Sequence, residues 1–570
     1  MQDRFQIAAA LREIGKLLEV KNENPFKAQA YDRGARALEN FGGDLDQLIR
    51  TKRLTEIPGI GKALASIIEE IYTTAECWML NQLREELPPG AAELSAVPGL
   101  NRKKIVALHD ALHIENVADL KTACQKGLVR TVKGFGEKSE AKLLADIEKL
   151  ETPQSEVPLH RALMEGERVI EYLRAVPSVD RAEIAGAVRR WKETVRRVQI
   201  VASSNDPKQV LDRILSYPGL SRTSELEEDR CAGPLASGAL LEVSLVAPSE
   251  FTVALHRATG SSTHLAKLDA LEAEERNGSK GKSAGRESSR ARDIRDEAEI
   301  YARLGLPYIA PEMREDQGEI EAALAGKLPQ PVTLEDIRGM THCHTVYSDG
   351  QNTIEEMARA AEAAGMKYIT ITDHSPTAFY ARGLDIDRLR AQWDEIDRVQ
   401  ERVKIKILKG TESDITEPGL LDYPDHILER FDIIIASIHA RNKMNSDQMT
   451  RRLINVMKQP VFKIWGHPLG RITLSRPPFE CRMEEVLDAV AESKAGIEVN
   501  GDPRRLDLEP RWIRAARERG IKFLVSTDAH SVGALGYLHF GVAMARRGWL
   551  TAGEVLNTRD TEDFMKAVRP

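Results

Sequence analysis

The segment THCHTVYSDG, residues 341–350, begins the part of the chain whose sequence pattern most clearly indicates its fold. Six short apolar runs follow it, separated by helix-period sequence, and each is long enough for one buried strand. They are MKYITITDH (366–374), VKIKILKGTES (403–413), FDIIIASIHA (431–440), VFKIWGHP (461–468), AGIEVNG (495–501) and IKFLVSTDAH (521–530). Strands that alternate with helices in this way predict a parallel sheet or a barrel of βα units.

Histidine and carboxylate residues stand at the ends of these runs. Parallel strands bring their carboxyl ends to one face of a sheet or barrel, so we expect the side chains to converge there. A single histidine at a strand end is usually an ordinary structural residue, but chance accounts poorly for the same placement on successive runs. The nine residues are His342, His344, Asp349, His374, Glu412, His439, His467, Asp528 and His530.

This residue set predicts a metal site. His342 and His344, like Asp528 and His530, are alternate residues of strand-like segments, so each pair is expected to point to one face. Imidazole and carboxylate ligands without thiolate suit Zn, Mn or Fe, and nine ligands exceed what one ion takes. We therefore expect two or three divalent metal ions that promote hydrolysis of a phosphoester. His344 and His374 are expected to be essential for catalysis.

Two arginines follow the histidine motifs closely. Arg441 comes just after His439, and Arg471 just after His467. Because guanidinium groups bind phosphate oxygens through paired hydrogen bonds, we expect both to hold substrate phosphate during catalysis. The alternative is that they are ordinary surface arginines.

A different pattern fills residues 1–150. Apolar positions there have the helical period, and short glycine-containing turns interrupt them. An internal repeat occurs three times, each time before a helical segment that contains lysine. The copies are Ile57-Pro-Gly-Ile-Gly61, Val97-Pro-Gly-Leu-Asn101 and Val132-Lys-Gly-Phe-Gly136.

Composition excludes several classes of protein. The chain has 570 residues with 81 Lys+Arg against 88 Asp+Glu, a net charge of −7, so it is not a globally basic nucleic-acid-binding protein. Five scattered cysteines without a C-x-x-C pair argue against a disulfide framework or a thiolate zinc site and fit a reducing cytoplasm. No run approaches the roughly 18 uncharged apolar residues of a membrane span, so we expect no membrane role.

The C-terminal motifs resemble a known domain. HCHTVYSDGQNT, ITDHSP, LKGTESDI, ASIHAR, WGHPLGR and STDAHS resemble the motifs of the PHP (polymerase and histidinol phosphatase) domain, a seven-stranded βα barrel with a trinuclear metal site. The ligand positions of that domain correspond to the nine residues named above. EVNGDPRRLDL, residues 498–508, resembles the segment that leads to its final Asp-x-His motif.

The rest of the chain resembles the bacterial X-family DNA polymerases, in which a polymerase-β-like core precedes a PHP domain. The similar segments are NPFKAQAYDRGARAL (24–38), EIPGIGKALASII (56–68), TGSSTHL (259–265) and LGLPYIAPEMREDQGEIE (304–321). The resemblance implies a multidomain chain with an α-helical helix-hairpin-helix N-terminal region, a small α/β polymerase-β-like palm and a C-terminal (β/α)7 PHP barrel.

The expected domain boundaries follow from this resemblance. They are 1–90 for a helical DNA-binding domain with a helix-hairpin-helix, 91–154 for a fingers-like helix-hairpin-helix domain, 155–262 for the palm, 263–330 for a thumb-like region with a disordered insertion at 276–292, and 331–570 for the PHP domain.

The resemblance implies that the three repeats are helix-hairpin-helix elements. In such elements, backbone amides at a helix N-terminus bind a DNA phosphate without sequence preference. Such a turn alone is more often only a turn. In the third copy Lys133 replaces proline, so this copy could be structural only. The residues expected to contact DNA are Gly59, Gly61, Lys62, Gly99, Lys103, Gly134 and Gly136.

The palm departs from the family pattern Gly-Ser-x-Arg-Arg-Gly-Lys-Glu-Thr-x-Gly-Asp-x-Asp. Its counterpart here is GAVRRWKETVRRVQ, residues 186–199. Arg197 and Gln199 stand at the two metal-binding aspartates, Ala187 stands at the phosphate-binding serine, and Glu242 aligns with the third carboxylate. Nucleotidyl transfer needs two divalent ions, so we expect this polymerase site to be degenerate.

A shifted alignment could restore one carboxylate, with Glu193 or Asp206 as the candidates. Glu193 nevertheless matches the Glu of the family's Lys-Glu-Thr, and Asp206 lies beyond the strand. We therefore expect polymerase activity to be lost.

The resulting hypothesis is a DNA-binding, metal-dependent phosphoesterase that acts as a 3′-5′ exonuclease or 3′-end-processing enzyme in DNA repair. It is expected to be a cytoplasmic monomer that acts on gapped DNA or 3′ ends without sequence preference. Three alternatives stay open: an active gap-filling polymerase with an auxiliary exonuclease, a non-enzymatic DNA-binding scaffold, and a small-molecule phosphatase of the histidinol type.

Overall fold

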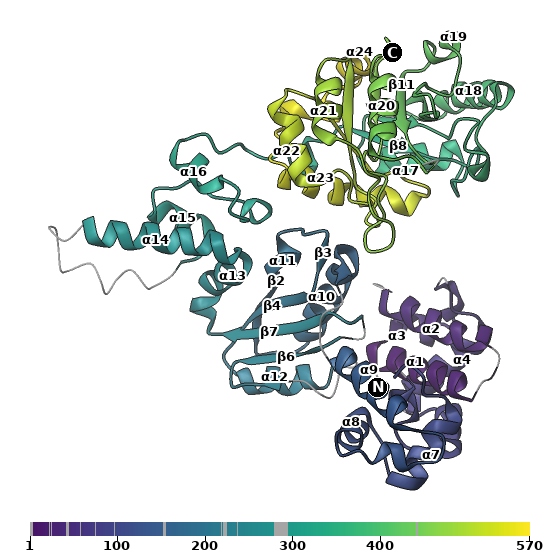
Figure 1. Cartoon of the computed structure of the whole chain (residues 1–570), viewed down its shortest axis with the longest axis vertical. Coiled ribbons are helices and arrows are strands. Elements are labelled where there is room, and N and C mark those ends of the chain that lie inside the picture. Colours follow the sequence, from purple (N-terminus) through teal and green to yellow (C-terminus); the bar gives the residue numbers. More distant parts are fainter. Residues whose placement is uncertain are drawn as a thin grey trace. The chain divides into compact units, whose positions relative to one another are not determined.

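The structure is a computed structural model, and the description covers residues 4–21, 23, 25–40, 45–57, 59–74, 76–95, 97–151, 156–217, 219–220, 225–235, 237–278, 294–440 and 443–569. The chain forms two compact units. One comprises Met1–Glu156, Met164–Glu183 and Arg196–Pro248, and the other comprises Val157–Leu163, Ile184–Val195 and Ser249–Pro570. Figure 1 labels the elements along the chain.

The N-terminal region is helical, as predicted. Its elements are α1 (Arg4–Val20), α2 (Pro25–Asn40), α3 (Leu45–Arg50), η1 (Leu54–Glu56), α4 (Lys62–Thr74), α5 (Trp78–Glu86), α6 (Ala91–Leu94), α7 (Arg102–Leu112), α8 (Val117–Gln125), η2 (Val129–Thr131) and α9 (Glu137–Glu151). Buried side chains from Ile7 to Ile147 form one hydrophobic cluster. This cluster includes residues on both sides of the expected boundary at residue 90.

Each sequence repeat forms a turn directly before a helix. The central glycines Gly59, Gly99 and Gly134 have φ of 94°, 85° and 96°, a left-handed conformation that favours glycine. Helices α4, α7 and α9 follow these turns. The apolar residues on both sides of each glycine are buried and anchor the turn: Ile57 and Ile60, Val97 and Leu100, Val132 and Phe135.

The palm region contains a five-stranded sheet in the order β2-β4-β7-β6-β5. Its strands are β2 (Val179–Ala185), β4 (Arg197–Ser204), β5 (Glu225–Leu226), β6 (Arg230–Pro234) and β7 (Leu240–Val246). Helix α10 (Leu159–Arg174) precedes β2, and α11 (Gly186–Arg189) and α12 (Pro207–Leu215) lie between strands along the chain. A second, two-stranded sheet pairs β1 (Val157–Pro158) with β3 (Thr194–Val195). The predicted strands at 195–203 and 239–247 are confirmed as β4 and β7.

The end of the expected palm and the thumb-like region contain η3 (Pro248–Glu250), α13 (Phe251–Thr259), α14 (Ser262–Gly278), α15 (Glu297–Arg303), η4 (Pro311–Met313) and α16 (Glu319–Leu324). Tyr301 and Ile309 are fully buried in its core. Residues 276–278 are the end of α14, so this helix extends three residues into the predicted insertion. The remainder of the predicted insertion, 279–292, lies outside the described residues.

The C-terminal region is a seven-stranded parallel barrel, as predicted. Its strands are β8 (Gly339–Cys343), β9 (Tyr368–Ile371), β10 (Lys406–Asp414), β11 (Ile433–Ser437), β12 (Lys463–Trp465), β13 (Ala495–Asn500) and β14 (Phe523–Ser526). They are ordered β8 to β14, and a parallel bridge between Cys343 and Ala529 joins the two edges. The barrel is therefore nearly closed.

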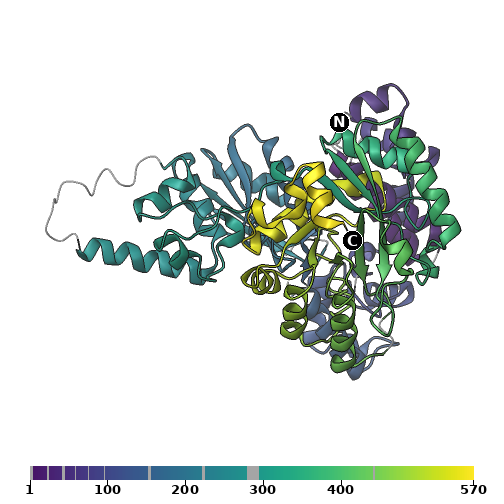
Figure 2. The ribbon, with the colours of Figure 1, turned by 90° about the horizontal axis from the view of Figure 1, so that it is seen from above.

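Helices lie outside the barrel strands (Figures 1 and 2). The helical elements are η5 (Leu334–Asp336), α17 (Ile354–Ala363), η6 (Phe379–Ala381), α18 (Ile386–Gln400), α19 (Asp425–Leu428), α20 (Ser446–Met457), α21 (Met483–Ala491), α22 (Pro510–Glu518), η7 (Val532–Tyr537), α23 (Leu538–Arg547), η8 (Ala552–Glu554), η9 (Leu556–Thr558) and α24 (Thr561–Val568). Helices outside and side chains inside cover both faces of the barrel strands. β8, β9 and β11 are buried throughout, which explains the continuous apolar sequence of β9 and β11.

Close approach between the first two strands requires a glycine. A Cβ at Gly339 would lie 1.9 Å from the ring of Tyr368 in the neighbouring strand. β8 therefore begins where a side chain cannot fit, and the ring of Tyr368 fills this space.

The five cysteines are free. Among the helices that the structure describes, none is long and apolar enough to cross a membrane.

Candidate metal centre

The nine predicted ligand residues lie at the carboxyl ends of the barrel strands. His342 is in β8, with His344 and Asp349 in the loop after it, His374 follows β9, Glu412 is in β10, His439 follows β11, His467 follows β12, and Asp528 and His530 follow β14. The topology thus brings together residues separated by almost 190 positions, because every parallel strand ends at the same face.

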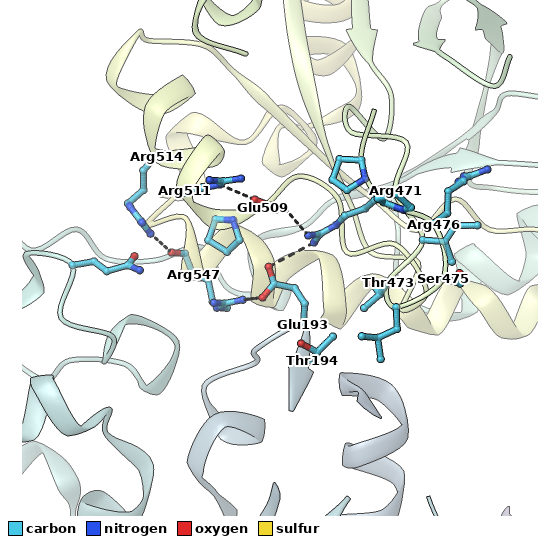
Figure 3. A pocket seen from close by; sticks show the side chains of 16 residues that line it. Glu193, Thr194, Arg471, Thr473, Ser475, Arg476, Glu509, Arg511, Arg514 and Arg547 are labelled. Carbon is cyan, nitrogen blue, oxygen red and sulfur yellow. Dashed lines mark hydrogen bonds and ion pairs between the residues drawn. The ribbon is translucent and has the colours of Figure 1, made fainter. Parts of the chain in front are cut away.

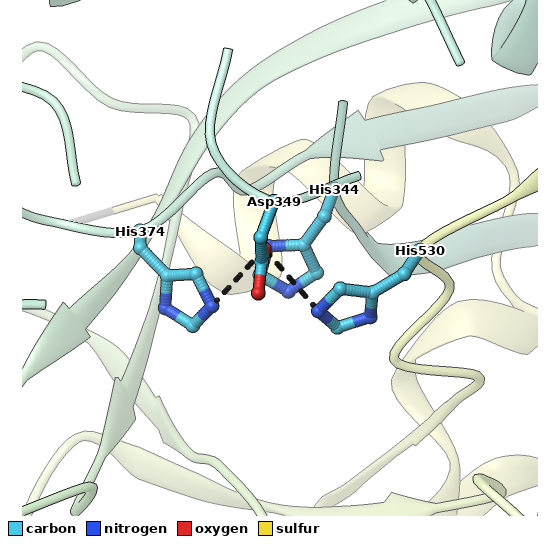
Figure 4. A group of neighbouring side chains, drawn as sticks. All are labelled: His344, Asp349, His374 and His530. Carbon is cyan, nitrogen blue, oxygen red and sulfur yellow. Dashed lines mark ion pairs between the residues drawn. The ribbon is translucent and has the colours of Figure 1, made fainter. Parts of the chain in front are cut away.

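Eight of the nine residues form three groups whose ligand atoms lie within 4.8 Å of one another. The groups are His344, Asp349, His374 and His530; His342, His344 and Asp528; and His374, Glu412 and His439. His344 and His374 each belong to two groups, so the groups form one continuous cluster. Figure 4 shows the first of them, with Asp349 among three imidazoles.

Glu412 is the centre of the remaining contacts. Its carboxylate lies 3.5 Å from His342 Nε2, 3.6 Å from His344 Nε2 and 2.9 Å from His374 Nδ1. The same carboxylate lies 3.3 Å from His439 Nε2 and 2.8 Å from His467 Nε2. His467, which belongs to none of the three groups, therefore joins the cluster through Glu412.

Many of these separations suit shared metal ions better than hydrogen bonds. Two ligand atoms bound about 2.1 Å from a tetrahedral ion are about 3.4 Å apart. Asp349 Oδ1 lies 3.5 Å from His374 Nε2 and 3.4 Å from His530 Nε2, and Asp528 Oδ1 lies 3.4 Å from His344 Nε2. Hydrogen bonds between the same atoms would be about 2.7–3.0 Å long.

Buried nitrogen atoms without hydrogen-bond partners also fit a metal site. His342 Nε2 and both ring nitrogens of His344 are in this state, although each side chain is fully buried. Leaving buried polar atoms unpaired is costly unless something binds them. The donor set, imidazole nitrogen and carboxylate oxygen, suits divalent ions such as Zn, Mn or Fe.

Backbone conformation helps to aim these ligands. His342, His467 and Asp528 have φ of 57°, 23° and 49°, which residues other than glycine rarely adopt. The pairing of β8 with β9 also shifts register between Met340 and Cys343. The predicted simple alternation is therefore replaced at His342 by a left-handed residue in an irregular strand, a kind of strain that is concentrated at functional sites.

Carboxylates behind the ligands fix two of the imidazoles. Glu498 Oε1 accepts from His342 Nδ1 at 2.5 Å, and Asp414 Oδ1 lies 3.0 Å from His439 Nδ1. Such contacts set the ring orientation and leave Nε2 for a metal. The sequence interpretation assigned neither carboxylate: Asp414 follows Glu412 in β10, whereas Glu498 is in β13, which carries none of the nine predicted ligands.

The ligand residues shift the pKa values of one another. Burial and the neighbouring His530 and His374 lower the pKa of His344 to about 3. Burial alone would raise the pKa of Glu412, but His439, His374 and His342 hold it well below its ordinary value. A neutral His344 and an ionised Glu412 are the protonation states that bind metals.

The two carboxylate oxygens of Asp528 make different contacts. Oδ1 faces His344, whereas Oδ2 lies 3.2 Å from Arg505 Nε and accepts from Asn500. Arg505 is largely buried, and its Nη1 is buried without a hydrogen-bond partner. Arg505 is thus an arginine at the metal centre that the sequence interpretation missed, although it lies within the quoted segment 498–508.

The two arginines chosen from sequence are placed differently. Arg441 lies outside the described residues. Arg471 donates to the carbonyl oxygens of Arg505 and Leu506 and pairs with Glu509 at 3.1 Å and Glu193 at 3.6 Å. Its described contacts do not include the metal-ligand residues.

Arg471 instead lines a separate cavity of about 600 Å³ (Figure 3). Arg476, Arg511, Arg514 and Arg547 line the same cavity. Figure 3 shows Glu193 between Arg471 and Arg547, with which it forms ion pairs.

The residues at the polymerase-like site form another charged cluster. Glu242, in β7, is 5% exposed and lies opposite Gln199 of β4. Its carboxylate accepts from Arg197 at 2.9 Å, Gln199 at 3.0 Å and Arg230 of β6 at 3.0 Å. Two guanidinium groups and one amide therefore surround the one carboxylate at this site.

The two carboxylates considered for a shifted alignment have other contacts. Asp206 caps α12 by accepting from the amide of Gln209 at 3.2 Å. Glu193 pairs with Arg547 and Arg471. Ala187 lies in the short helix α11.

The three hairpins differ in how their amides are used. In the third, the amide of Gly136 donates to Ser139 Oγ at 2.7 Å, and Glu137 and Glu140 are in the first turn of α9. In the first, Gly59 and Gly61 line an open cavity of about 410 Å³ together with Arg33. Lys62 and Lys103, at the starts of α4 and α7, are exposed.

Comparisons with known families agree with this architecture. Residues 3–77 match the helix-hairpin-helix domain, 91–149 the SAM-like helix-hairpin-helix tandem, 254–315 the DNA polymerase beta thumb, and 341–502 the PHP domain. The DNA polymerase/3'-5' exonuclease PolX of Bacillus subtilis (strain 168) is 32% identical over 569 residues, which cover 98% of this chain and 99% of that protein. The chain belongs to the bacterial X-family DNA polymerases.

Other relatives of this PolX-family chain match a smaller share of it. A probable phosphatase of Thermoanaerobacter pseudethanolicus is 34% identical over 38% of this chain and 89% of that protein. A probable phosphatase of Aliivibrio fischeri is 26% identical over 38% of this chain and 88% of that protein. The chain therefore joins a metal-dependent phosphoesterase domain to DNA-binding helix-hairpin-helix and thumb domains.

Proposed function

We propose that the chain is a metal-dependent 3′-5′ exonuclease or 3′-end-processing enzyme that acts in DNA repair and has lost polymerase activity. The observation that carries this proposal is the single cluster of nine histidine and carboxylate residues in a chain with DNA-binding domains. The overlap of three ligand groups supports two or three divalent ions, with Mn, Zn or Fe as candidates.

When bound, such ions lower the pKa of water and neutralise charge on a phosphoryl group. Within the chain, Glu498 and Asp414 keep His342 and His439 in the orientation that presents Nε2. Asp373 accepts from the amide and hydroxyl of Thr345 at 2.8 and 2.7 Å and so fixes the loop after β8. These contacts preorganise the ligands before substrate arrives.

Arg505 is proposed to bind an oxygen of the reacting phosphate. Its Nε is held by Asp528, and its unpartnered Nη1 can donate to an anionic ligand. This is the role that the sequence interpretation gave to Arg441 and Arg471. The contacts of Arg471 with Glu193, Glu509 and two carbonyl oxygens favour a positioning role for that residue.

Loss of polymerase activity is supported by the environment of Glu242. Two metal ions need several carboxylate oxygens, whereas Arg197 and Arg230 already neutralise this one. A divalent ion at this position would have to displace both guanidinium groups. Glu193 and Asp206, the alternative ligands, have the structural contacts described above.

DNA is proposed to bind through the first two hairpins, at Gly59, Gly61, Lys62, Gly99 and Lys103. Open glycine turns before α4 and α7 leave the backbone accessible to a phosphate. The third hairpin, with Gly134 and Gly136, is proposed to be structural, because Ser139 already accepts from one of its amides. Gapped DNA with a 3′ end is the proposed substrate, and the proposed active form is a monomer.

The test is a nuclease assay on end-labelled DNA with Mn²⁺. The wild-type chain should shorten 3′ ends, and His344→Ala or His374→Ala should reduce the rate by orders of magnitude. The matched control is His426→Ala, an exposed histidine of the same domain. Full activity in either metal-centre variant would contradict the assignment of the site.

A small-molecule phosphatase is the second candidate, because two relatives that match 38% of this chain are named probable phosphatases. Competition separates the two: DNA should inhibit hydrolysis of a small phosphoester if both use one site. A small phosphoester cleaved at a rate that DNA does not affect would favour the phosphatase.

A further inference from the structure

Two exposed aromatic side chains border the metal centre. Phe379 is 84% exposed and Tyr380 is 62% exposed. The centre of the Tyr380 ring lies 6.4 Å from that of His374 and 6.2 Å from that of His439, and the Phe379 ring lies 6.1 Å from Tyr380. An aromatic surface therefore lies directly beside two of the metal-ligand residues.

The short helix that carries these rings reverses the usual pattern of burial. Within this turn, Ala378 and Ala381 are buried at 0% and 2% exposure, whereas the two large rings point outward. Burying the aromatic residues instead would stabilise the fold more, because they carry far more apolar area. Exposed aromatic rings at this position are therefore available to an external ligand.

The loop that holds the rings is firmly anchored. The amide of Leu384 donates to the carbonyl oxygen of His374 at 2.8 Å, which closes the loop at its base. Asp422 accepts from the amide and the hydroxyl of Thr377 at 2.7 and 2.8 Å. Gly383 crosses so close to a backbone carbonyl oxygen that a Cβ would lie 1.9 Å from it. The rings are thus presented by a fixed turn.

We propose that Phe379 and Tyr380 form a stacking surface for the nucleobase of the terminal nucleotide whose phosphoester is cleaved. This inference rests on the proposed exonuclease function. A terminal nucleotide must leave the base stack of its strand to bring its phosphate to a buried centre, and an aromatic side chain can replace the lost stacking. Every base has a π face, so this contact selects for the presence of a base and tolerates any sequence.

The surface has apolar and polar parts that suit a nucleotide. Val346, which is 42% exposed, follows the ligand His344 by two positions and adds an exposed apolar side chain to this domain. Arg382, next to the aromatic turn, donates to the carbonyl oxygen of Val346 at 3.4 Å and so ties the two loops together. A base against the rings and a phosphate at the histidine cluster are then neighbours, as they are in one nucleotide.

The experiment combines removal of the rings with removal of the base. Phe379→Ala, Tyr380→Ala and the double variant are assayed with Mn²⁺ on a single-stranded oligonucleotide with an ordinary 3′-terminal nucleotide, and on the same strand with an abasic 3′-terminal residue. Tyr380→Phe keeps the ring, and Leu334→Ala removes an exposed apolar side chain located before β8. Metal content is measured for every variant.

The wild-type chain should cleave the abasic terminus about tenfold more slowly than the ordinary one, and the double variant should lose about tenfold on the ordinary terminus only. Leu334→Ala should behave as wild type, and Tyr380→Phe should retain more activity on the ordinary terminus than Tyr380→Ala does. Equal losses on both substrates, or no loss on either, would overturn the stacking surface while leaving the exonuclease intact. A wild-type chain that cleaves neither substrate would overturn the exonuclease proposal and this one with it.

Discussion

At the residue scale, contacts distinguish groups that look equivalent in the sequence. Arg471 and Arg505 both stand near ligand motifs, yet only Arg505 has a described ion pair with a ligand, Asp528. Spacing along the chain could not separate them, because the choice depends on how the loops after β12 and β13 fold. The nine ligand positions could be proposed from sequence because they stand in or just after segments with a strand-like pattern. Glu498 and Asp414 were overlooked because they stand behind the ligands.

Replacing Arg505 tests the proposed phosphate contact. Arg505→Gln should lower kcat/KM for DNA cleavage about a hundredfold, because a charge-assisted contact to phosphate contributes roughly 2–3 kcal/mol. Arg505→Lys should recover only part of this loss, since lysine cannot hold Asp528 and phosphate together. Steady-state kinetics and metal analysis measure both effects.

Arg504→Gln is the matched control, because the neighbouring Arg504 pairs with Asp502 and is 70% exposed at its side chain. If Arg505→Gln keeps its full metal content and its kcat/KM is unchanged, Arg505 does not contact the substrate.

At the element scale, regular segments could be predicted and irregular ones could not. The strands β9 to β14 coincide with apolar runs, since burial on both faces imposes a continuous signal. The left-handed residues His342 and Asp528 have no such signal, because tertiary contacts determine their conformation. Helix α14 likewise extends through residues 276–278, at the start of the predicted insertion.

The hairpins give a prediction about salt. If backbone amides carry most DNA contacts, few counterions are released, so the slope of log K against log salt should be shallow. Fluorescence anisotropy of the full chain measures this slope, and a slope equivalent to ten or more released ions would indicate a basic face.

Gly59→Ala should weaken DNA binding more than Gly134→Ala does. Both place alanine at a similar positive φ, so strain is matched. Equal effects would contradict a special role for the first hairpin.

The buried ion pairs of the thumb-like region predict a pH dependence of stability. Burial alone would raise the pKa of Glu297, but hydrogen bonds from Arg189 and Arg314 lower it to about 2. Because the folded pKa lies below the ordinary value of 4.5, its stabilisation, roughly 3 kcal/mol, is full above that value and is lost as pH falls toward 2. Glu297→Gln should therefore lower the thermal midpoint strongly at pH 7 and much less at pH 3.

The control for this prediction is Glu299→Gln, which changes an exposed carboxylate of the same helix, α15. It should have little effect at either pH. If Glu297→Gln lowers the thermal midpoint by the same amount at both pH values, the charge of Glu297 does not contribute to stability.

At the scale of the whole molecule, the chain has the architecture of a polymerase with two candidate metal sites that differ in charge. The C-terminal cluster gathers histidines and carboxylates with unpartnered buried nitrogens. In the palm, arginines neutralise Glu242.

Replacing Arg197 and Gln199 by Asp would supply metal ligands and remove the adverse positive charge. Weak nucleotide addition at most should result, because Ala187 still lacks the hydroxyl that binds phosphate.

The most direct test of the account is one gel assay on gapped DNA labelled at the 5′ end of the primer, with Mn²⁺ and all four dNTPs. The account predicts products shorter than the primer from the wild-type chain, none longer, and an unchanged primer with His374→Ala. Template-dependent products longer than the primer, persisting in His374→Ala, would show that the palm holds catalytic metal ions and would contradict the claim that only the C-terminal site is catalytic.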